Sequence, residues 1–514
     1  SFGYIKDIQV DDSGTVYVVG YWHKAGTTPE GQTFWASTGN SDGVIFAINP
    51  DGTTKWFRGF HATRHAYLKA VDVDNNGSVV VAGKWNAWGT MMDNAGKSAP
   101  AVNSGPGAKP FVAKLDAETG STEWSYWWNV CVDDHSNVED VTFLSDGSVV
   151  AVGGYSDRGD TPNANTVVYD SRSRTDCGSS VIRGADAWSG EQRSWIFGTG
   201  GGNRSNMVKL SADGDFLWGR EFGSVTQLNY ATELAVDPTN DDMFIVGSWS
   251  KYTEANDHYY APTIPSNNAD FPASTFTRPG WNSNGTQPAT DGSTNLRLNP
   301  ALHEGCSVNP CDTTNYLDTN QDTYLLHVDK HGNYKNVTSF DVHNTLERRA
   351  DIDINNDGSE LVISNTGFYA YPDHAAPSGM RHGAAGWVMT VNPADLTEKW
   401  TVIHDVHKYD RNTISAGSKS MTWVEDVRYG PEDTVYSSGR GYGEVKIGET
   451  ASGPGSAFPF AKFTSLSTNN KTDGLVVKYD AAGNIAGGVP PVIPNEVPDG
   501  YSVVKGPFHL GDTV

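Results

Sequence analysis

The stretch Gly77-Ser78-Val79-Val80-Val81-Ala82-Gly83 decides the fold, because its pattern recurs six times along the chain. In each copy a Gly or Asp ends a turn, four strand-forming residues follow, and another Gly usually stands six positions after the first. The copies are marked by Gly14 and Gly20, Gly77 and Gly83, Gly147 and Gly153, Asp241 and Gly247, Gly358 and Ser364, and Asp433 and Gly439. A single unit of this kind cannot bury its own faces, so we expect the units to pack against one another.

The residues around each copy predict four antiparallel strands per unit. Alternate residues before the turn are apolar, as at Val71 and Val73, which is typical of a half-buried strand. A third strand follows a long excursion, and four units carry a Trp four residues beyond the next turn, which we expect to pack between units: Trp56, Trp124, Trp218 and Trp400. The sequence therefore predicts an all-β fold, a six-bladed β-propeller of four-stranded antiparallel blades over residues 1–489, followed by a Pro-rich tail over residues 490–514.

Two segments resemble a known repeat family. Lys109-Pro110-Phe111-Val112-Ala113-Lys114-Leu115-Asp116 and Asp473-Gly474-Leu475-Val476-Val477-Lys478-Tyr479-Asp480 are similar to the third strand of the β-propeller repeat family common in bacterial cell-surface proteins. The resemblance covers only the blade framework within residues 5–488. It implies the fold and a tendency to surface location, and it implies no single activity.

The composition restricts the partners of the chain. Its formal net charge of −24 argues against nucleic acid and anionic membranes, because both bind basic surfaces. No apolar run approaches the roughly 18–20 residues that a membrane-spanning helix needs. We therefore expect neither nucleic acid as a partner nor a transmembrane segment, whereas a bound cation is compatible with the acidic surface.

Cysteine and asparagine patterns favour a secreted or cell-surface protein. The four cysteines give an even count without a C-x-x-C motif, and two of them share one short loop that a disulfide could close. The candidate disulfide residues are Cys131, Cys177, Cys306 and Cys311, and the Asn-x-Ser/Thr glycosylation acceptors are Asn76, Asn203, Asn284, Asn336 and Asn470. Acceptor motifs also arise by chance in a chain rich in Asn, Ser and Thr.

The long excursions between second and third strands predict where partners bind. In a propeller these loops share one rim with the connections between blades, so the elaborated sequence gathers on one face. Several loop aromatics could stack on sugars or protein partners, or could instead form small cores within the loops: Trp188, Trp195, Tyr252, Tyr259, Tyr260 and Trp281. We expect other proteins or copies of this chain to bind this face and the C-terminal tail, with glycans as a further class of ligand.

Acidic residues recur at the start of the innermost strands. Alignment of the units on their first turn places Asp7, Asp140, Asp351 and Asp426 in register, whereas Ala70 and Leu234 interrupt the ring. Clustered carboxylates favour divalent cations such as calcium, although an Asp at such a junction commonly accepts backbone N–H groups of the turn before it instead. Histidines in nearby connections suggest a metal or acid–base site at the channel mouth: His61, His65, His135, His343, His404 and His407.

Two functions remain open from the sequence. A structural or interaction module, for example a subunit of an extracellular fibre or coat, is favoured because the acidic surface with glycan acceptors, the Trp-packed disc and the Pro-rich tail suit a building block. No nucleophile motif, phosphate-binding loop, nicotinamide fingerprint or zinc constellation occurs in the sequence. The alternative is a carbohydrate-active enzyme, a lyase or a hydrolase, with its site at the channel mouth. The fold supports either function.

Overall fold

The computed structural model describes the blade framework of the chain. The described residues are 3–23, 26–27, 33–34, 41–60, 65–74, 76–86, 108–130, 137–157, 166–170, 194–197, 202–222, 229–250, 321–340, 346–347, 350–372, 380–405, 421–442, 444–447, 461–464 and 473–485. Within these ranges the single helical element is the 3₁₀ turn η4 (Pro431–Asp433). No helix among the described residues is long and apolar enough to cross a membrane.

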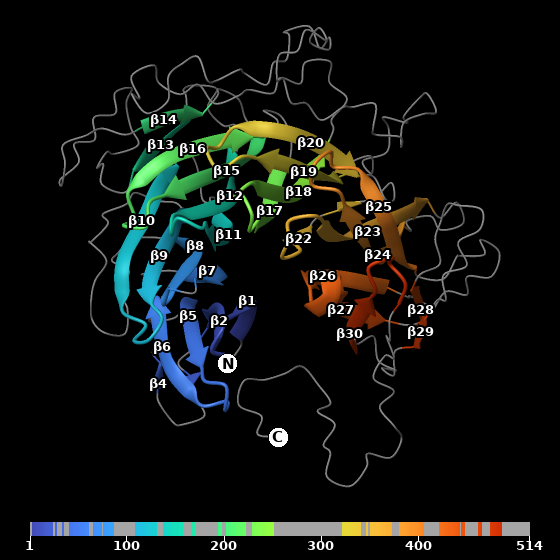
Figure 1. Cartoon of the computed structure of the whole chain (residues 1–514), viewed down its shortest axis with the longest axis horizontal. Helices are drawn as coiled ribbons and strands as arrows, with labels where there is room; N and C mark the ends of the chain where they lie inside the picture. The colour runs from blue at the N-terminus through green and yellow to red at the C-terminus, as the bar shows by residue number, and fades with distance from the viewer. Residues whose placement is uncertain are drawn as a thin grey trace, which may run out of the picture.

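Six antiparallel sheets surround a central channel, with the first strand of each sheet innermost (Figure 1). Blade 1 contains β1 (Gly3–Val10), β2 (Val16–Trp22), β5 (Asp42–Ile48) and β6 (Thr54–Phe60). Blade 2 contains β7 (His65–Val73), β8 (Ser78–Asn86), β9 (Ala108–Asp116) and β10 (Thr122–Val130). Blade 3 contains β11 (Asn137–Phe143), β12 (Val149–Asp157), β15 (Gly202–Leu210) and β16 (Phe216–Phe222). Blade 4 contains β17 (Asn229–Val236), β18 (Met243–Ser250), β19 (Gln321–Val328) and β20 (Tyr334–Phe340). Blade 5 contains β22 (Asp351–Ile354), β23 (Leu361–Pro372), β24 (Met380–Val391) and β25 (Glu398–Asp405). Blade 6 contains β26 (Met421–Tyr429), β27 (Val435–Tyr442) and β30 (Asp473–Tyr479). The predicted six-bladed propeller is confirmed. In blade 6 a bridge between Tyr479 and Ile485 begins the fourth strand at the end of the described residues.

Short additional strands extend two of the sheets. β13 (Thr166–Asp170) and β14 (Ser194–Phe197) arise from the blade 3 excursion and pair with β10 of blade 2. β28 (Glu444–Ile447) and β29 (Ala461–Thr464) arise from the blade 6 excursion and pair with β25 of blade 5. β21 (Leu346–Glu347) joins β19 to β23, and β3 (Gly26–Thr27) pairs with β4 (Thr33–Phe34). Two excursions therefore continue the sheet of the preceding blade.

The second Gly of the repeat is required by a bulge in the innermost strand. In blade 2 the pairing of β7 with β8 shifts register between Leu68 and Ala70. A Cβ added at Gly83 would lie 1.9 Å from the carbonyl oxygen of Tyr67, so a larger residue cannot occupy this position. A Cβ added at Gly20, Gly153 or Gly439 would lie 1.9 to 2.1 Å from the equivalent carbonyl oxygen in the same blade. The bulge reorients the following side chain and is seen in blades 1, 2, 3, 4 and 6, whereas the corresponding part of blade 5 lies outside the described residues.

The recurrent tryptophans pack between blades, as predicted. Trp56 of blade 1 donates its indole N–H to the carbonyl oxygen of Ala117 in blade 2 at 2.9 Å. Its ring lies against Gly120, which has a φ of 66° and where an added Cβ would lie only 2.6 Å from the indole. The same pairing joins Trp124 to Gly214 and Trp400 to Gly483. The positive φ and the neighbouring indole ring together exclude a larger residue at each of these glycines.

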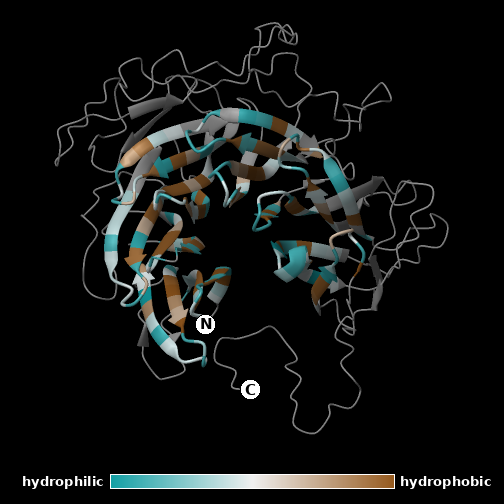
Figure 2. Ribbon diagram, in the orientation of Figure 1, coloured by the Kyte–Doolittle hydropathy of each residue, from teal (hydrophilic) through white to brown (hydrophobic). Residues whose placement is uncertain are grey.

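Five apolar layers hold successive blades together. Each layer combines side chains from two neighbouring blades, for example Tyr17 and Val19 of blade 1 with Val71 and Val81 of blade 2. Figure 2 shows brown apolar segments alternating with pale and teal segments along the strands, as expected for sheets stacked face to face. The core is therefore divided among the seams between blades rather than gathered in one centre.

Candidate functional site: the central channel

One position in every innermost strand forms a ring around the channel. In five blades it follows the bulge and pairs with the residue just before the second Gly of the repeat, as Asp7 pairs with Val19 and Asp140 pairs with Val152, whereas in blade 5 Asp351 pairs with Ser364. The ring consists of Asp7, Ala70, Asp140, Glu233, Asp351 and Asp426. Five of the six ring positions therefore carry a carboxyl group.

Glu233, not Leu234, occupies the ring position of blade 4, which corrects the sequence alignment. Four residues separate the end of β17 from the positive-φ residue Asp241, whereas three separate the end of β1 from Gly14. The longer turn shifts the register by one residue, and Glu233 pairs with Val246. Alignment on the turn alone could not detect this insertion, because the strands on both sides retain their alternation.

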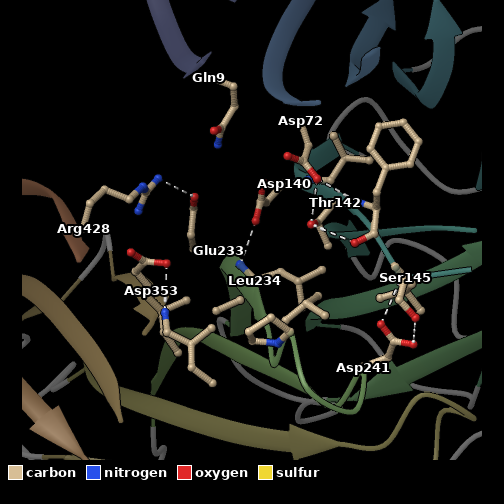
Figure 3. Close-up of a pocket in the computed structure, with 18 of the residues that line it drawn as sticks. Gln9, Asp72, Asp140, Thr142, Ser145, Glu233, Leu234, Asp241, Asp353 and Arg428 are labelled. Carbon is tan, nitrogen blue, oxygen red and sulfur yellow. Dashed lines mark hydrogen bonds and ion pairs between the residues drawn. The ribbon is translucent and has the colours of Figure 1, made fainter. Parts of the chain in front are cut away.

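A second ring lies two residues further along the innermost strands. It consists of Gln9, Asp72, Thr142, Ala235, Asp353 and Arg428, and all of them line a cavity of about 460 Å³ together with Asp140 and Glu233. Figure 3 shows Gln9, Asp72, Asp140, Glu233 and Arg428 directed towards this common space. The channel therefore presents carboxyl groups at two levels and a single guanidinium.

Carboxylates of the first ring tie neighbouring blades together. Asp7 accepts the N–H of Ile8 in its own strand at 2.7 Å and the N–H of Val71 in blade 2 at 2.8 Å. Asp140 and Asp351 repeat this arrangement, accepting N–H groups from blade 4 at 2.7 Å and from blade 6 at 2.6 Å. These carboxyl groups therefore accept backbone N–H groups, but from their own strand and from the next blade rather than from the preceding turn, which the sequence suggested.

The second ring supplies further ties between blades. Asp72 accepts the N–H of Phe143 in blade 3 at 2.8 Å, and Asp353 accepts the N–H of Tyr429 in blade 6 at 2.7 Å. Between blades 4 and 5, the Thr232 hydroxyl donates to the carbonyl oxygen of Ala350 at 2.6 Å. Each of the five seams from blade 1 to blade 6 thus has a polar tie beside the channel.

Arg428 joins three carboxyl groups of the first ring. Its Nη1 lies 2.9 Å from Asp351 and 3.1 Å from Asp426, and its Nη2 lies 3.5 Å from Glu233. Burial opposes the charge of the guanidinium, but the three carboxyl groups outweigh it and hold the pKa of Arg428 above its usual value. Blades 4, 5 and 6 are therefore connected through one cation.

Burial raises the pKa values of several channel carboxyl groups. The pKa of Asp7 rises to about 6 despite the N–H of Val71. The pKa of Asp140 rises to about 8, first because of burial and then because of the negative charge of Asp7. Burial, with Asp140 and Asp351 nearby, also raises the pKa of Glu233 well above its usual value. At neutral pH the channel therefore carries less negative charge than its residue count suggests.

The predicted cation site remains a prediction. Among the described residues, no group of three or more His, Cys, Asp or Glu side chains is arranged to hold a metal ion. Asp7, Asp140 and Asp351 direct their oxygens at backbone N–H groups, and Asp426 lies against Arg428.

The structure places one of the predicted histidines, His404, away from the channel. His404 is buried between blades 5 and 6, where its Nε2 contacts the Tyr479 hydroxyl and burial lowers its pKa to about 3. His65 lies at the start of β7 and stacks on Tyr67, with ring centroids 5.7 Å apart. The structure therefore does not bring His404 into the acid–base site predicted at the channel mouth, and the role of His65 stays a prediction.

Other predicted residues lie in turns, in strands or outside the described part. Asn76 is exposed in the first turn of blade 2, Asn336 lies in β20, and Asn203 and Trp195 fall within β15 and β14. Predicted residues outside the described ranges are His61, His135, His343, His407, Trp188, Tyr252, Tyr259, Tyr260, Trp281, Asn284, Asn470, Cys131, Cys177, Cys306, Cys311 and the tail over residues 490–514. Their roles stay predictions.

Comparison with known proteins adds little about activity. No protein-family model matches the chain, and no curated protein matches it. Among solved structures, it is similar to the quinohemoprotein alcohol dehydrogenase from Comamonas testosteroni, with a TM-score of 0.28 and 11% sequence identity. The match covers 86% of this chain and 65% of that chain. A likeness this weak says nothing about what the present chain binds or catalyses.

Proposed function

We propose that this protein is a non-catalytic interaction module of a secreted or cell-surface assembly, such as a fibre or coat. The observation that carries the proposal is the position of the long excursions. In every blade they leave from the end of the second strand and return at the start of the third, on the rim that also holds the connections between blades. The opposite rim holds the short turns within each blade. A rigid disc with one elaborated rim suits the presentation of binding segments to partners.

The chemistry of the channel supports a structural role. Asp7, Asp72, Asp140 and Asp353 each accept a backbone N–H from the following blade, so their oxygens are engaged within the framework. The buried, neutral His404 is likewise unsuited to proton transfer with a ligand in the channel. The hydrogen bonds that these carboxyl groups make between blades stabilise the ring, which is a sufficient reason for their presence in the channel.

The proposal is tested by the association state of the full chain and of a rim variant. Ser250 and Gln321 stand directly opposite each other in the pairing of β18 with β19, so an Asn-Gly turn can replace residues 251–320 without moving the blade. We expect light scattering to show oligomers of the full chain and smaller species for this variant. The control variant carries Asp12→Lys and Asp213→Lys, two changes in the short turns of the opposite rim. We expect light scattering to show that this variant still forms oligomers. A full chain that stays monomeric at all concentrations contradicts self-assembly.

The secretory part of the proposal has a separate test. Asn76 is exposed in a tight turn, where a glycan can extend into solvent without disturbing the blade. Expression through a eukaryotic secretory pathway should give a product whose mobility changes on glycosidase treatment, and Asn76→Gln should reduce that change. A secreted product without any glycan would remove this support.

A carbohydrate-active enzyme is the second candidate, because the cavity holds carboxyl groups in different environments. Glu233 faces the cavity beside Arg428, and the pKa of Asp140 is raised to about 8, which suits a general acid at neutral pH. Release of new reducing ends from a polysaccharide panel, abolished by Glu233→Gln, would support this candidate. The control Asp213→Asn changes an exposed carboxylate and should leave any such activity unaltered.

A further inference from the structure

The seam between blade 6 and blade 1 differs from the five others in its exposed apolar residues. Ile8 follows the ring position in β1 and is 52% exposed. Its counterparts in the other blades are at most 6% exposed: Val71, Val141, Leu234, Ile352 and Val427. On the same strand Ile5 and Val10 are also exposed, although the counterparts of Ile5 that the structure describes are buried: Leu68, Val138, Ala231 and Val424.

On the other side of this seam, blade 6 also exposes an apolar residue that is buried in the other blades. Val476 in β30 of blade 6 is 57% exposed. The residues at its position in the third strands of the other blades are all buried: Ile45, Val112, Met207, Leu325 and Val388. Two apolar walls that are sealed elsewhere are therefore both open to solvent here.

The seam between blades 1 and 6 is wider than the five others. The innermost strand β1 packs against β7 of blade 2, and β22 packs against β26, but β1 and β26 make no comparable packing contact. Figure 1 shows that blades 1 and 6 leave a broader interval than any other pair of neighbours. At the periphery, an added Cβ at Gly52 in the outer turn of blade 1 would meet nothing within 4 Å, whereas Gly120 and Gly214 meet a tryptophan.

The chain that follows blade 6 has the length and composition to fill this interval. The described residues end at Ile485, beside Tyr479 of blade 6, and residues 486–514 continue from there. Tyr501, Val503, Phe508 and Leu510 are spaced for strands with one apolar face. Residues 486–498 contain four prolines and suit an extended connector, whereas residues 499–514 have room for about two short strands of the usual 5–6 residues, which can pack against an apolar wall.

We propose that residues 486–514 dock within the same molecule into the seam between blade 6 and blade 1, covering Ile5, Ile8 and Val10 on one side and Val476 on the other. The occupied seam would repeat the apolar contacts of the five closed seams and complete the ring. Docking within the molecule joins two segments that one chain already holds close together, which favours it over docking on a second copy at low protein concentration. This inference is independent of the proposed function, because a monomeric protein and an assembled one can both close the seam.

Site-specific photo-crosslinking in the full chain tests the proposal. Ile8 is replaced by benzoylphenylalanine, and equal amounts of unlabelled and heavy-isotope-labelled protein are mixed before irradiation. We expect cross-links from position 8 to residues 486–514, joining peptides of the same isotopic label. Replacement of Val476 should give cross-links to the same segment from the facing wall. The matched control, Leu217 in β16, is also exposed but lies in blade 3 and should give none.

Other outcomes overturn the proposal. Cross-links from position 8 to β27 or β30 would show that blade 6 itself closes the seam. Cross-links between peptides of different label would place a second copy there, and absence of any cross-link would show that the surface stays uncovered. Tyr501→Ser with Val503→Ser should cause loss of the cross-link while circular dichroism stays that of the parent, and an unchanged yield would contradict the role of these side chains.

Discussion

Five seams join blades that follow each other in the sequence, and a sixth seam lies between the last blade and the first. The two kinds of seam use the same repeat in different ways. A closed seam combines a tie beside the channel, a buried aliphatic side chain after the ring position and, in three cases, a tryptophan under a glycine turn. At the sixth seam the aliphatic residue Ile8 is half exposed, Gly52 meets no ring, and the sixth repeat has Gly487 where Trp would stand. The comparison shows that the repeat encodes blades, whereas particular side chains encode how the ring closes.

The largest expected effect compares the same residue type at the two kinds of seam. Ile352 and Ile8 occupy equivalent positions, but Ile352 is 2% exposed. Ile352→Ala removes buried methyl groups and leaves a cavity, so we expect the free energy of unfolding to fall by about 4 kcal/mol. In a chain that stops at residue 485, Ile8→Ala should cost about 1 kcal/mol, because half of its surface already meets solvent.

Urea denaturation of both variants checks this difference. In the full chain we expect a larger cost for Ile8→Ala than in the shortened chain, because residues 486–514 would cover this side chain. Equal costs for Ile352→Ala and Ile8→Ala in the shortened chain would mean that the sixth seam is as tightly packed as the others, and the comparison would fail.

A glycine turn gives the next largest effect. Gly214 has a φ of 84°, and an added Cβ would lie 2.6 Å from Trp124. Gly214→Ala combines an unfavourable left-handed backbone with displacement of the indole, so we expect a loss of about 3 kcal/mol. Gly52 has nearly the same φ, 85°, with open space around it, and Gly52→Ala should cost about 1 kcal/mol.

Thermal and urea unfolding of the two glycine variants separate backbone strain from packing. The backbone term is common to both, so the difference reports the contact with Trp124. If both variants lose the same free energy, the Trp-on-Gly contact contributes nothing and the tryptophan must be retained for another reason.

A smaller effect concerns the tie at the seam between blades 3 and 4. The pKa of Asp140 is about 8 in the folded protein and near its ordinary value of 3.8 in the unfolded chain. Between these values the folded state keeps a proton that the unfolded state has released, so stability is greatest at acidic pH and falls as the pH rises towards 8. We expect a loss of about 2 kcal/mol between pH 6 and pH 7.5, at up to about 1.4 kcal/mol per pH unit.

Asp140→Asn tests the origin of this pH dependence. The amide cannot ionise and should remove the share of Asp140 from the slope, leaving the share of Glu233 and Asp351, whose pKa values burial also raises, while Asp213→Asn, an exposed control in a turn, should leave the slope unchanged. Stability that stays constant or rises between pH 6 and pH 7.5 in the parent protein would show that Asp140 is already ionised there.

The sequence could predict the blades but not the details of their contacts. The spacing of Gly77 and Gly83 reflects one turn and one bulge, which are local features, and so the six units were recognisable. The ring position of Glu233 was misplaced, because one extra residue in the turn shifts the register without altering any pattern. Arg428 was missed altogether, since its contacts with Asp351 and Glu233 join residues that are distant in the sequence. No local signal marks such a contact.

The smallest expected effect again compares equivalent residues at a closed seam and at the open one. Lys209 in blade 3 and Lys478 in blade 6 both lie in the third strand, opposite Val150 and Tyr436. Lys209 is buried at the seam with blade 4 and donates to the carbonyl oxygen of Lys330 at 3.4 Å, whereas Lys478 lies over the ring of Tyr436 at 5.3 Å.

Lys209→Ala should lower the free energy of unfolding by about 1.5 kcal/mol, because the seam loses the packing of its aliphatic stem as well as a hydrogen bond. Lys478→Ala should cost about 0.5 kcal/mol, the contribution of an exposed cation–π contact. Salt distinguishes the two in urea denaturation: the cost of Lys209→Ala is mainly packing and should persist at 1 M salt, where the Debye length is about 3 Å. If Lys478→Ala proves the more costly change in the full chain, its side chain must lie beneath a segment that covers the sixth seam, and residues 486–514 are the segment that continues from that wall.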